Sequence, residues 1–429
     1  MNIQELYSIY RTYPDISTDS RDIRPGCLFF ALKGEKFNGN RFVAEALEKG
    51  AAWVIADEKE CPPGDRITRV EDGLHALQQL ASVHRQECRF KILAITGSNG
   101  KTTTKELCSS VLAQKYRLYA TSGNLNNHIG LPLTLLAMPP DTEIGIVEMG
   151  ANHPGEIRFL CSIAKPDCGL ITNIGKAHLE GFGSLQGVTA AKGELFDYLK
   201  NHGGIIFANM GDENLRTILP GEKERVIPYN SNGTYWAERK GEGLYLELVI
   251  HDHHQKYPVS SRLVGSYNME NMVAAYAVGK YFGIPSSLIT ESIEAYSPSN
   301  NRSQFIRTSH NEIILDAYNA NPSSMKAAIE NFIAIKPSSG LIILGDMLEL
   351  GKSSASEHQS VIDMLKGKGM QQVICIGSNF EIPAKTAGYS WHPDVSDLQK
   401  ALTASPIRES FILIKGSRGN RLEKIVDLL

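Results

Sequence analysis

Residues 91–105 carry side chains whose types and spacing suit the binding of a nucleotide triphosphate. The apolar residues 92–95 predict a buried strand, which is followed by two glycines and then by Lys101 and Thr102 at the expected start of a helix. The backbone N–H groups of such a turn surround an anion, the helix N-terminus adds partial positive charge, and the lysine adds a full charge. The Thr102 hydroxyl is placed to bind the magnesium ion that accompanies the nucleotide.

This loop departs from the common phosphate-loop pattern at one position. The pattern has a glycine five residues before Gly100, and this chain has Ile95 there. A short Gly-Lys-Thr sequence can also be an ordinary turn with a surface lysine. The strand before the turn and the helical pattern after it favour the phosphate site. We therefore predict that ATP contacts the loop residues Gly97, Ser98, Asn99, Gly100, Lys101, Thr102 and Thr103.

The composition is that of an ordinary soluble globular protein, with 21% charged and 42% hydrophobic residues. A chain of 429 residues is too long to fold around one compact hydrophobic core, so about three domains are expected. The net charge of −3 gives no reason to expect nucleic acid or an anionic membrane as the main partner. No apolar run is long enough to span a bilayer, and the first residues lack the pattern of a secretory signal.

The seven cysteines are scattered along the chain and are never spaced as Cys-x-x-Cys. Neither a disulfide framework nor a zinc site is expected, and most of the thiols should be small buried groups. A reducing compartment fits this usage best. We therefore expect a cytoplasmic protein.

The residues before the phosphate loop predict a small α/β domain over residues 1–85. Its expected strands cover residues 28–32 and 53–56, with a helix between them and a linking helix after them. Ser20 and Arg21 lie in a turn of this domain. They either cap the turn or bind an anion.

A central domain is expected over residues 86–300. Its strands at residues 144–147 and 170–172 are followed by Glu148 and, further along, by His178. Because the carboxyl ends of parallel strands collect at one edge of a sheet, both side chains should converge near the phosphate loop. Polar side chains elsewhere in this domain are Asn126 and Asn127 in an amide-rich loop, Lys192 in a helical stretch and Asn271 one turn into a later helix.

Residues 235–264 alternate as strands do, and they predict an antiparallel hairpin appended to the central domain. The run His251-Asp-His-His254 invites a metal site. Adjacent residues of a strand point to opposite faces, however, and the run falls at the expected hairpin tip. We therefore predict a solvated turn there.

The remaining residues, 301–429, predict a second α/β unit. Its apolar strands cover residues 313–315, 341–344, 373–376 and 411–414. Polar segments follow these strands and contain the candidate binding residues Arg302, Asp316, Tyr318, Asn319, Asn321, Lys415 and Arg418. His358 stands near a helix start, and we expect it to be exposed.

Taken together, these segments closely resemble the Mur ligases, the ATP-dependent amino-acid-adding enzymes of bacterial peptidoglycan synthesis. The resemblance runs nearly from end to end. It rests on Asp19-Ser-Arg21, Gly123-Asn-Leu-Asn-Asn127, Glu148-Met-Gly-Ala151, Thr172-Asn-Ile-Gly-Lys-Ala-His178, Tyr318-Asn-Ala-Asn-Pro322, Gly345-Asp-Met-Leu-Glu-Leu-Gly351 and Lys415-Gly-Ser-Arg418, in this order.

The resemblance implies three domains: a small N-terminal α/β domain for a UDP substrate, a central P-loop ATPase-like parallel sheet with the added antiparallel hairpin, and a C-terminal Rossmann-like domain for the incoming amino acid or dipeptide. By similarity, two magnesium ions would be held by Thr102, Glu148, His178 and a carbamylated Lys192. Lys101, His178 and Lys192 would serve catalysis, with Asn271, Arg302 and Asp316 on the nucleotide.

The implied reaction activates a carboxylate of the substrate as an acyl phosphate, which the amine of a second substrate then attacks. The most similar branch of the family joins D-alanyl-D-alanine to UDP-N-acetylmuramoyl-tripeptide, in cell wall biogenesis, cell shape and cell division. The substrates would contact Ser20, Arg21, Asn126, Asn127, Tyr318, Asn319, Asn321, Lys415 and Arg418. We expect a monomer without nucleic-acid partner or membrane insertion.

Alternatives remain open at this stage. A sibling ligase would add a single amino acid, and a folylpolyglutamate synthetase-like ligase would lack the Asp-Ser-Arg domain before the phosphate loop. A nucleotide-regulated binding protein without synthetic activity would not need Glu148, His178 and Lys192 together. For individual residues, Lys192 would otherwise be an exposed lysine, and the asparagines after Tyr318 would otherwise only shape a turn.

Overall fold

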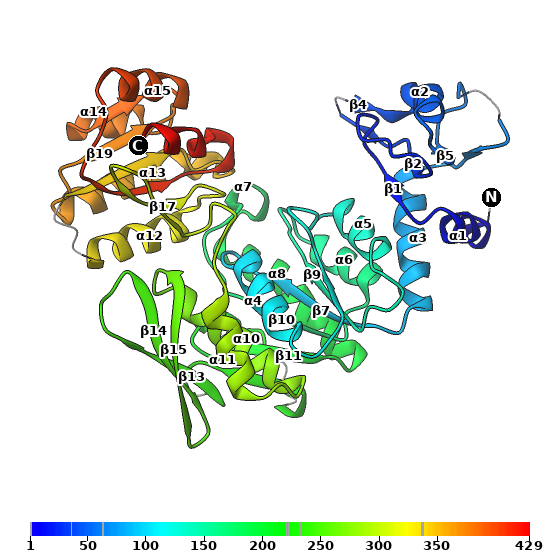
Figure 1. The fold of residues 1–429 in the computed structure, drawn as a ribbon, viewed down its shortest axis with the longest axis horizontal. Coiled ribbons are helices and arrows are strands. Elements are labelled where there is room, and N and C mark those ends of the chain that lie inside the picture. The colour runs from blue at the N-terminus through cyan, green and yellow to red at the C-terminus, as the bar shows by residue number, and fades with distance from the viewer. Residues whose placement is uncertain are drawn as a thin grey trace.

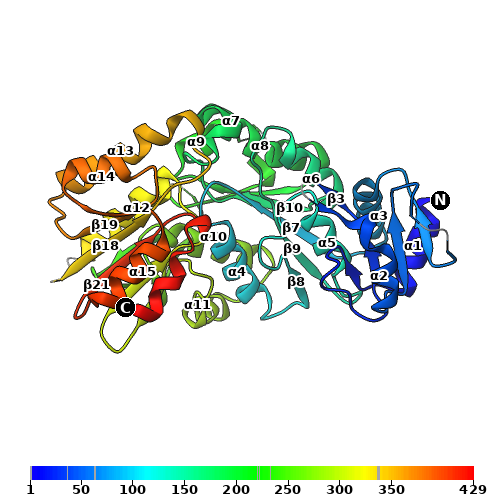
Figure 2. The ribbon, with the colours of Figure 1, turned by 90° about the horizontal axis from the view of Figure 1, so that it is seen from above.

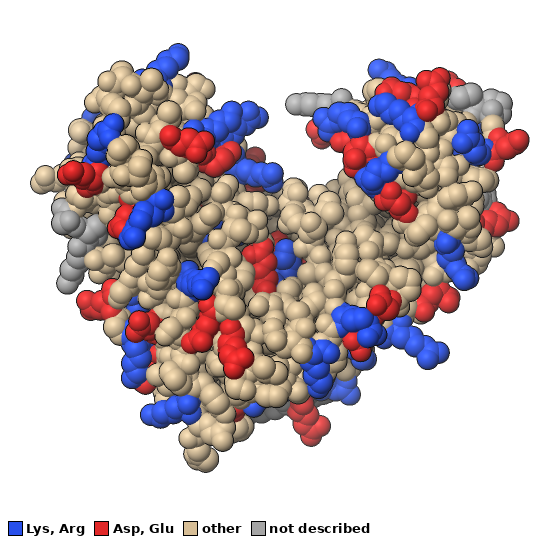
Figure 3. All heavy atoms as spheres, viewed as in Figure 1, with Lys and Arg blue, Asp and Glu red and all other residues tan. Residues whose placement is uncertain are grey.

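Three β-sheets organise the chain, one in each of three α/β domains, as the sequence predicts (Figure 1). The structure is a computed structural model, and it describes residues 2–35, 37–61, 64–219, 221, 223–231, 233–335 and 339–429. The first and last domains lie at opposite ends of the molecule, with the central domain between them (Figure 2). A wide notch separates the two outer domains in the space-filling view (Figure 3).

The first domain contains a parallel sheet in the order β1-β2-β5-β6. Its strands are β1 (Ile16–Ser17), β2 (Leu28–Phe30), β5 (Trp53–Ala56) and β6 (Ile67–Arg69), with a small pair β3 (Lys33–Gly34) and β4 (Phe37–Asn38) beside it. Side chains of β2 alternate between two cores: Phe29 packs with helix α2 (Val43–Glu48), and Phe30 packs with α1 (Ile3–Thr12) and α3 (Gly73–Glu87). Both faces of the sheet are therefore covered.

Helix α3 joins the first domain to the central one. It contacts α5 (Gly130–Leu136) and α6 (Glu156–Ala164) of the central domain. Its buried residues Leu77 and Leu80 belong to one hydrophobic core that extends from α1 into the central domain. The two domains are thus packed together along this helix.

The central sheet has nine strands in the order β15-β14-β13-β12-β11-β10-β7-β9-β8. From β12 to β8 all neighbouring strands are parallel. These strands are β7 (Lys91–Thr96), β8 (Leu118–Ala120), β9 (Ile144–Glu148), β10 (Cys168–Ile171), β11 (Ile205–Asn209) and β12 (Val226–Tyr229). Since β7 lies between β9 and β10, their carboxyl ends meet beside the phosphate loop.

Helices cover both faces of this sheet. On one face lie α4 (Lys101–Leu112), α10 (Asn268–Tyr281) and α11 (Ser286–Ala295). On the other lie α5, α6 and α8 (Leu185–His202). The short helices α7 (Leu179–Phe182) and α9 (Glu213–Thr217) complete the domain.

The expected hairpin is confirmed by the antiparallel strands β13 (Tyr235–Lys240), β14 (Tyr245–Asp252) and β15 (Gln255–Val264). The prediction of a solvated turn over residues 251–254 is wrong for its first two residues, because β14 continues through them. His251 is buried and stacks on Trp236 of β13, with 3.7 Å between the ring centroids. Asp252 is buried and accepts a hydrogen bond from the Tyr276 hydroxyl at 3.0 Å.

The last domain contains a six-stranded sheet in the order β16-β17-β21-β18-β19-β20. All neighbours are parallel except the edge strand β16. The strands are β16 (Gln304–Arg307), β17 (Glu312–Asp316), β18 (Gly340–Gly345), β19 (Val373–Ile376), β20 (Ser390–His392) and β21 (Phe411–Lys415). Helices α12 (Pro322–Ile335), α13 (Ser354–Gly367) and α14 (Glu381–Ala387) cover one face, and α15 (Val395–Ala404) with the 3-10 helix η5 (Leu422–Leu428) covers the other.

His358 is fully buried, which corrects the expectation that it is exposed. It lies one turn into α13, on the face that carries the buried Val361 and Ile362. Its Nδ1 contacts the Ser354 carbonyl oxygen at 2.7 Å, and its Nε2 accepts a hydrogen bond from the Met347 N–H at 3.0 Å. Burial lowers the pKa of this imidazole, which fits a neutral ring that donates through Nδ1.

All seven cysteines carry free thiols, and only Cys88 is not fully buried. The expectation of small buried thiols is therefore confirmed. Within the described residues, no helix has both the length and the apolar character needed to cross a membrane.

Candidate active site

The phosphate loop lies between β7 and α4, where the sequence predicts it. Gly97 adopts φ +142° and Gly100 adopts φ +78°, both outside the range that other residues favour. A Cβ atom at Gly97 would lie 2.0 Å from Thr172 Oγ1, and one at Gly100 would lie 2.6 Å from Asn271 Oδ1. Both glycines are therefore required by backbone conformation and by close neighbours.

The segment after β10 braces this loop. Asn173 Oδ1 accepts a hydrogen bond from the Asn99 N–H at 3.0 Å, and Thr172 Oγ1 donates to the Asn99 carbonyl at 2.6 Å. Ser98 Oγ donates to the Gly175 carbonyl at 3.1 Å. The phosphate loop is thus held in its conformation by hydrogen bonds from residues 172–175. Asn173 was missed as a functional residue, although its place directly after a parallel strand is a signal for one.

Lys101 lies over the loop that it follows. Its Nζ donates to the Gly97 carbonyl at 2.8 Å and to the Ser98 carbonyl at 3.3 Å. Burial lowers the pKa of this ammonium group. The amine of Lys101 is therefore held at the phosphate loop by two carbonyl oxygens of that loop.

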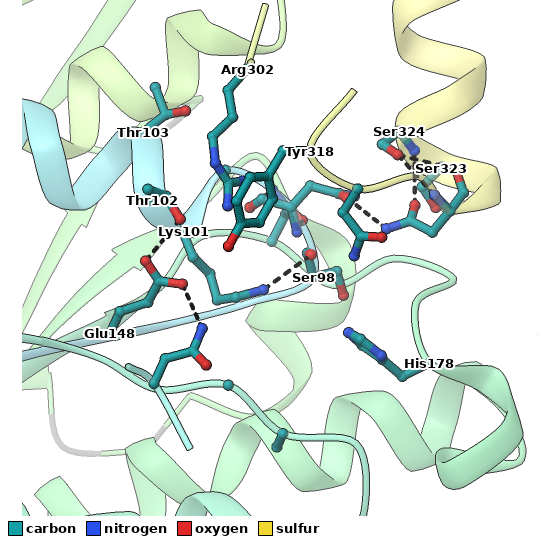
Figure 4. Close-up of a pocket in the computed structure, with 18 of the residues that line it drawn as sticks. Ser98, Lys101, Thr102, Thr103, Glu148, His178, Arg302, Tyr318, Ser323 and Ser324 are labelled. Carbon is teal, nitrogen blue, oxygen red and sulfur yellow. Dashed lines mark hydrogen bonds between the residues drawn. The ribbon is translucent and has the colours of Figure 1, made fainter. Parts of the chain in front are cut away.

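Glu148 lies at the centre of a polar cluster beside the loop (Figure 4). Its Oε2 accepts a hydrogen bond from Thr102 Oγ1 at 2.8 Å, and its Oε1 accepts one from Asn126 Nδ2 at 2.8 Å. Lys105 Nζ lies 3.8 Å from Glu148 Oε2. Lys105 was also missed, and the signal for it is its position one helical turn after Lys101.

His178 meets the C-terminal domain at the same site. It lines the cavity with Glu148 and adopts φ +51° immediately before α7. Its Nδ1 lies 2.5 Å from Oε2 of Glu349, which follows β18. This contact holds the pKa of the Glu349 carboxyl below its ordinary value. Within the described residues, no three His, Cys, Asp or Glu side chains cluster closely enough to hold a metal ion by themselves.

A cavity of about 450 Å³ lies between the central and C-terminal domains and brings most of the predicted residues together. The central domain contributes the loop residues 98–103 with Asn126, Asn127, Glu148, His178 and Asn271. The C-terminal side contributes Arg302, Asp316, Tyr318, Asn319, Asn321 and Lys415. Gly97, Lys192, Ser20, Arg21 and Arg418 do not line it.

Charged and aromatic groups of the C-terminal side form two close pairs. The Arg302 guanidinium carbon lies 3.7 Å from the centroid of the Tyr318 ring, and Arg302 Nε is buried without a hydrogen-bond partner in the described structure. Lys415 is almost fully buried, and its Nζ donates to Asp316 Oδ2 at 2.7 Å. Arg418 is exposed and lies 5.4 Å from the same tyrosine ring, in a neighbouring cavity of about 350 Å³.

The predicted amides are already engaged by the protein. Asn127 Oδ1 accepts hydrogen bonds from two N–H groups at the start of α5. Asn319 Oδ1 accepts one from the Ala320 N–H at 2.9 Å. Asn271 Oδ1 accepts from Thr104 Oγ1 at 3.0 Å, and its Nδ2 donates to Asn268 at 2.8 Å. Asn271 therefore joins α10 to α4 while also lining the cavity.

Lys192 is 1% exposed, which excludes the alternative that it is a surface lysine. Its Nζ donates to the Ala151 carbonyl at 3.2 Å and lies 5.2 Å from the centroid of the Phe182 ring. Burial, together with the nearby charge of Lys101, lowers the pKa of Lys192 to about 7. The amine is therefore neutral in a large fraction of molecules near neutral pH.

Ser20 and Arg21 belong to the first domain and do not line the cavity. Arg21 is exposed and pairs with Asp19 at 2.6 Å. Ser20 is buried, and its carbonyl accepts a hydrogen bond from Lys49 Nζ at 3.1 Å. The structure thus places these two residues in the first domain, and their contact with a substrate stays a prediction.

Comparison with known proteins identifies relatives over the whole chain. Sequence models described as Mur ligase family, catalytic domain, Mur ligase middle domain, and Mur ligase, glutamate ligase domain match residues 12–85, 95–279 and 301–418. The UDP-N-acetylmuramoyl-tripeptide–D-alanyl-D-alanine ligase of Bacillus subtilis is 36% identical over 425 residues, which cover 96% of this chain and 92% of that protein.

Solved structures agree with the sequence relatives. The crystal structure of MurF from Acinetobacter baumannii superposes with a TM-score of 0.87 at 29% identity, and the match covers 100% of this chain and 98% of that one. MurF ligase from Thermotoga maritima in complex with ADP gives a TM-score of 0.85 at 26% identity, covering 97% of each chain.

Proposed function

The chain belongs to the Mur ligase family, and we propose that it joins D-alanyl-D-alanine to UDP-N-acetylmuramoyl-tripeptide in the cytoplasmic synthesis of peptidoglycan precursors. As an ATP-dependent ligase it forms a peptide bond. The observation that carries the proposal is the single cavity in which the phosphate loop faces strand ends of the C-terminal domain. The substrate pair rests on the similarity to full-length relatives of that activity.

The reaction proceeds in two steps. The tripeptide carboxylate attacks the γ-phosphorus of ATP, which gives an acyl phosphate and ADP. The dipeptide amine then attacks the acyl carbon, loses a proton and expels phosphate. Catalysis of the first step rests on positioning and charge neutralisation, which the loop N–H groups and Lys101 supply here.

Magnesium would be held by Thr102, Glu148 and His178. The donor chemistry of Thr102 and Glu148 fits, because the Thr102 hydroxyl lies 2.8 Å from the buried Glu148 carboxylate and oxygen ligands are those that magnesium prefers, while His178 lines the same cavity. A bound magnesium ion supplies charge neutralisation at the phosphates. Asn126 donates a hydrogen bond to the other oxygen of the Glu148 carboxylate, and the Lys105 ammonium lies 3.8 Å from Oε2.

Lys192 would be carbamylated. Carbon dioxide reacts with the neutral form of an amine, and the lowered pKa of about 7 makes that form abundant. The carbamate replaces a buried positive charge by a negative one. Lys192 lies behind the cavity wall, next to the Ala151 carbonyl of the segment that follows Glu148, so a carbamate on this side chain would add a negative charge beside that segment.

The remaining roles divide between the outer domains. Ser20 and Arg21 bind the UDP part of the first substrate, and Asn271, Arg302 and Asp316 lie on the nucleotide side of the cavity. Tyr318 and Asn319 face the dipeptide, whereas the Asn321 amide ties the start of α12 to the phosphate loop. We assign the terminal carboxylate of the dipeptide to Arg418 rather than Lys415, because the charge of Lys415 is already neutralised by Asp316, whereas Arg418 is exposed.

An isotope experiment tests this function. With oxygen-18 in the tripeptide carboxylate, one labelled oxygen should appear in the released phosphate, and release should require ATP and both other substrates. Unlabelled phosphate would exclude carboxylate activation by phosphoryl transfer. Nucleotide binding without any phosphate release would instead support a regulatory binding protein.

A further inference from the structure

Glu349 stands on a loop whose backbone is fixed by side chains of its own domain. The Met347 N–H donates to His358 Nε2 at 3.0 Å, and the Leu348 N–H donates to Ser417 Oγ at 3.0 Å. Glu349 itself adopts φ +65°, a conformation that residues other than glycine rarely adopt. Strained residues that are held by their surroundings are often found at functional sites. The loop therefore holds the backbone of Glu349 in one conformation, from which a half-exposed side chain reaches His178.

The carboxylate is presented to the other domain. Glu349 Oε2 lies 2.5 Å from His178 Nδ1, and the Glu180 N–H donates to the Glu349 carbonyl at 3.4 Å. Both the side chain and the backbone of Glu349 thus contact the start of α7. His178 also has positive φ, +51°. Two residues in uncommon conformations therefore meet across the domain boundary, next to the cavity.

A histidine that binds a metal usually donates its second ring N–H to a carboxylate, which fixes its tautomer and orientation. The Glu349 carboxylate lies 2.5 Å from Nδ1 of His178 as an ion-pair contact in which the ring N–H is not aligned for a hydrogen bond, and Nε2 is the nitrogen left for a ligand. We propose that Glu349 is a positioning residue that orients His178 from the C-terminal domain, so that the metal site is complete only when the two domains are in contact. This inference rests on the proposed magnesium role of His178.

A simpler role for Glu349 would be to hold the two domains together without orienting His178. The structure offers a matched control for this alternative. Lys176 Nζ lies 2.7 Å from Glu357 Oε1, an ion pair that joins the same two segments two residues away from His178. Lys176 does not line the cavity. Glu357→Gln therefore removes a contact of the same kind between the domains without touching His178.

The experiment measures Mn²⁺ binding to the full-length protein by electron paramagnetic resonance, with a non-hydrolysable ATP analogue present. Glu349→Gln should weaken Mn²⁺ binding by about 10- to 100-fold, the usual effect of losing an outer partner of a ligating histidine. Glu357→Gln should stay within about twofold of the wild type, because its carboxylate has no contact with a ligand. Thermal melts of both variants report that they fold.

Three outcomes would overturn the inference. Wild-type Mn²⁺ affinity in Glu349→Gln would remove the positioning role. This holds even if the same variant shows a raised KM for the dipeptide. Equal weakening in Glu349→Gln and Glu357→Gln would assign the effect to domain contact alone. Wild-type affinity in His178→Ala would instead refute the magnesium role of His178, and the ligase activity itself would remain to be judged by the isotope experiment.

Discussion

Asn321 Nδ2 donates a hydrogen bond of 2.8 Å to Asn99 Oδ1 across the boundary between the C-terminal and central domains. Its Oδ1 accepts a hydrogen bond from the Ser324 N–H at 2.9 Å and thereby caps α12. One amide thus ties the first turn of that helix to the phosphate loop. The sequence predicts that Asn321 binds the dipeptide. To do so, its amide would have to give up one or both of these hydrogen bonds.

Asn321→Ala should therefore weaken ATP binding more than dipeptide binding. The lost hydrogen bond is worth about 1 kcal/mol, which corresponds to a rise of about fivefold in the KM for ATP. Steady-state kinetics with each substrate varied in turn measure the two KM values. A rise in the dipeptide KM alone would return Asn321 to the substrate-binding role.

Lys101→Ala should abolish most ATP turnover and leave the fold intact. Removing one preorganised charge donor from a developing anion costs about 3–4 kcal/mol, or a few hundred- to a thousandfold in kcat. Phosphate release measures the loss, and circular dichroism reports the fold. Near-normal turnover in this variant would remove Lys101 from the mechanism.

Lys192→Met should stabilise the unmodified protein below neutral pH. The folded-state pKa of about 7 lies below the ordinary value of 10.5, so the unfolded chain binds more protons between these two values. The free energy of unfolding of the wild type therefore rises with pH in this window, and the full penalty of about 5 kcal/mol applies below it. The methionine variant lacks this penalty.

Urea unfolding at pH 6 and pH 9, in buffer free of carbon dioxide, measures the difference between Lys192→Met and the wild type. The difference should be largest at pH 6 and should shrink at pH 9. An equal difference at both pH values would show that Lys192 is not a buried, titrating amine.

Carbamylation of Lys192 predicts a specific signal. Wild-type protein equilibrated with carbon-13-labelled bicarbonate should show a carbamate carbon resonance that Lys192→Met lacks, and activity should fall when carbon dioxide is removed. The signal should grow as the pH rises above about 7, because the neutral amine is the reactive form. Full activity in depleted buffer with no such resonance would contradict the carbamate.

The sequence predicts the elements of the site well, because strand, turn and helix signals are local. Glu148 contacts Thr102, and His178 lines the same cavity, as expected from the parallel neighbours β7, β9 and β10, whose carboxyl ends share one edge. The fold class and the order of the domains follow from the same strand and helix patterns.

The partners of individual side chains were not predictable from the sequence. Asn126 is predicted to bind substrate, and the structure shows in addition that it donates a hydrogen bond to Glu148. An amide can serve either purpose, and only its three-dimensional neighbours decide which groups it satisfies. The burial of Lys192 depends on how helix α8 packs against the rest of the domain, which the sequence of the helix does not specify. The contact between His178 and Glu349 joins residues of two different domains.

The measurement that tests the central claim most directly is ATP-dependent ligation by the full chain, with the product identified by mass spectrometry. UDP-N-acetylmuramoyl-tripeptide is offered with D-alanyl-D-alanine or, separately, with D-glutamate, L-lysine or diaminopimelate. The account predicts a product that carries the dipeptide and little or no product with the single amino acids. Efficient addition of a single amino acid, without addition of the dipeptide, would contradict it.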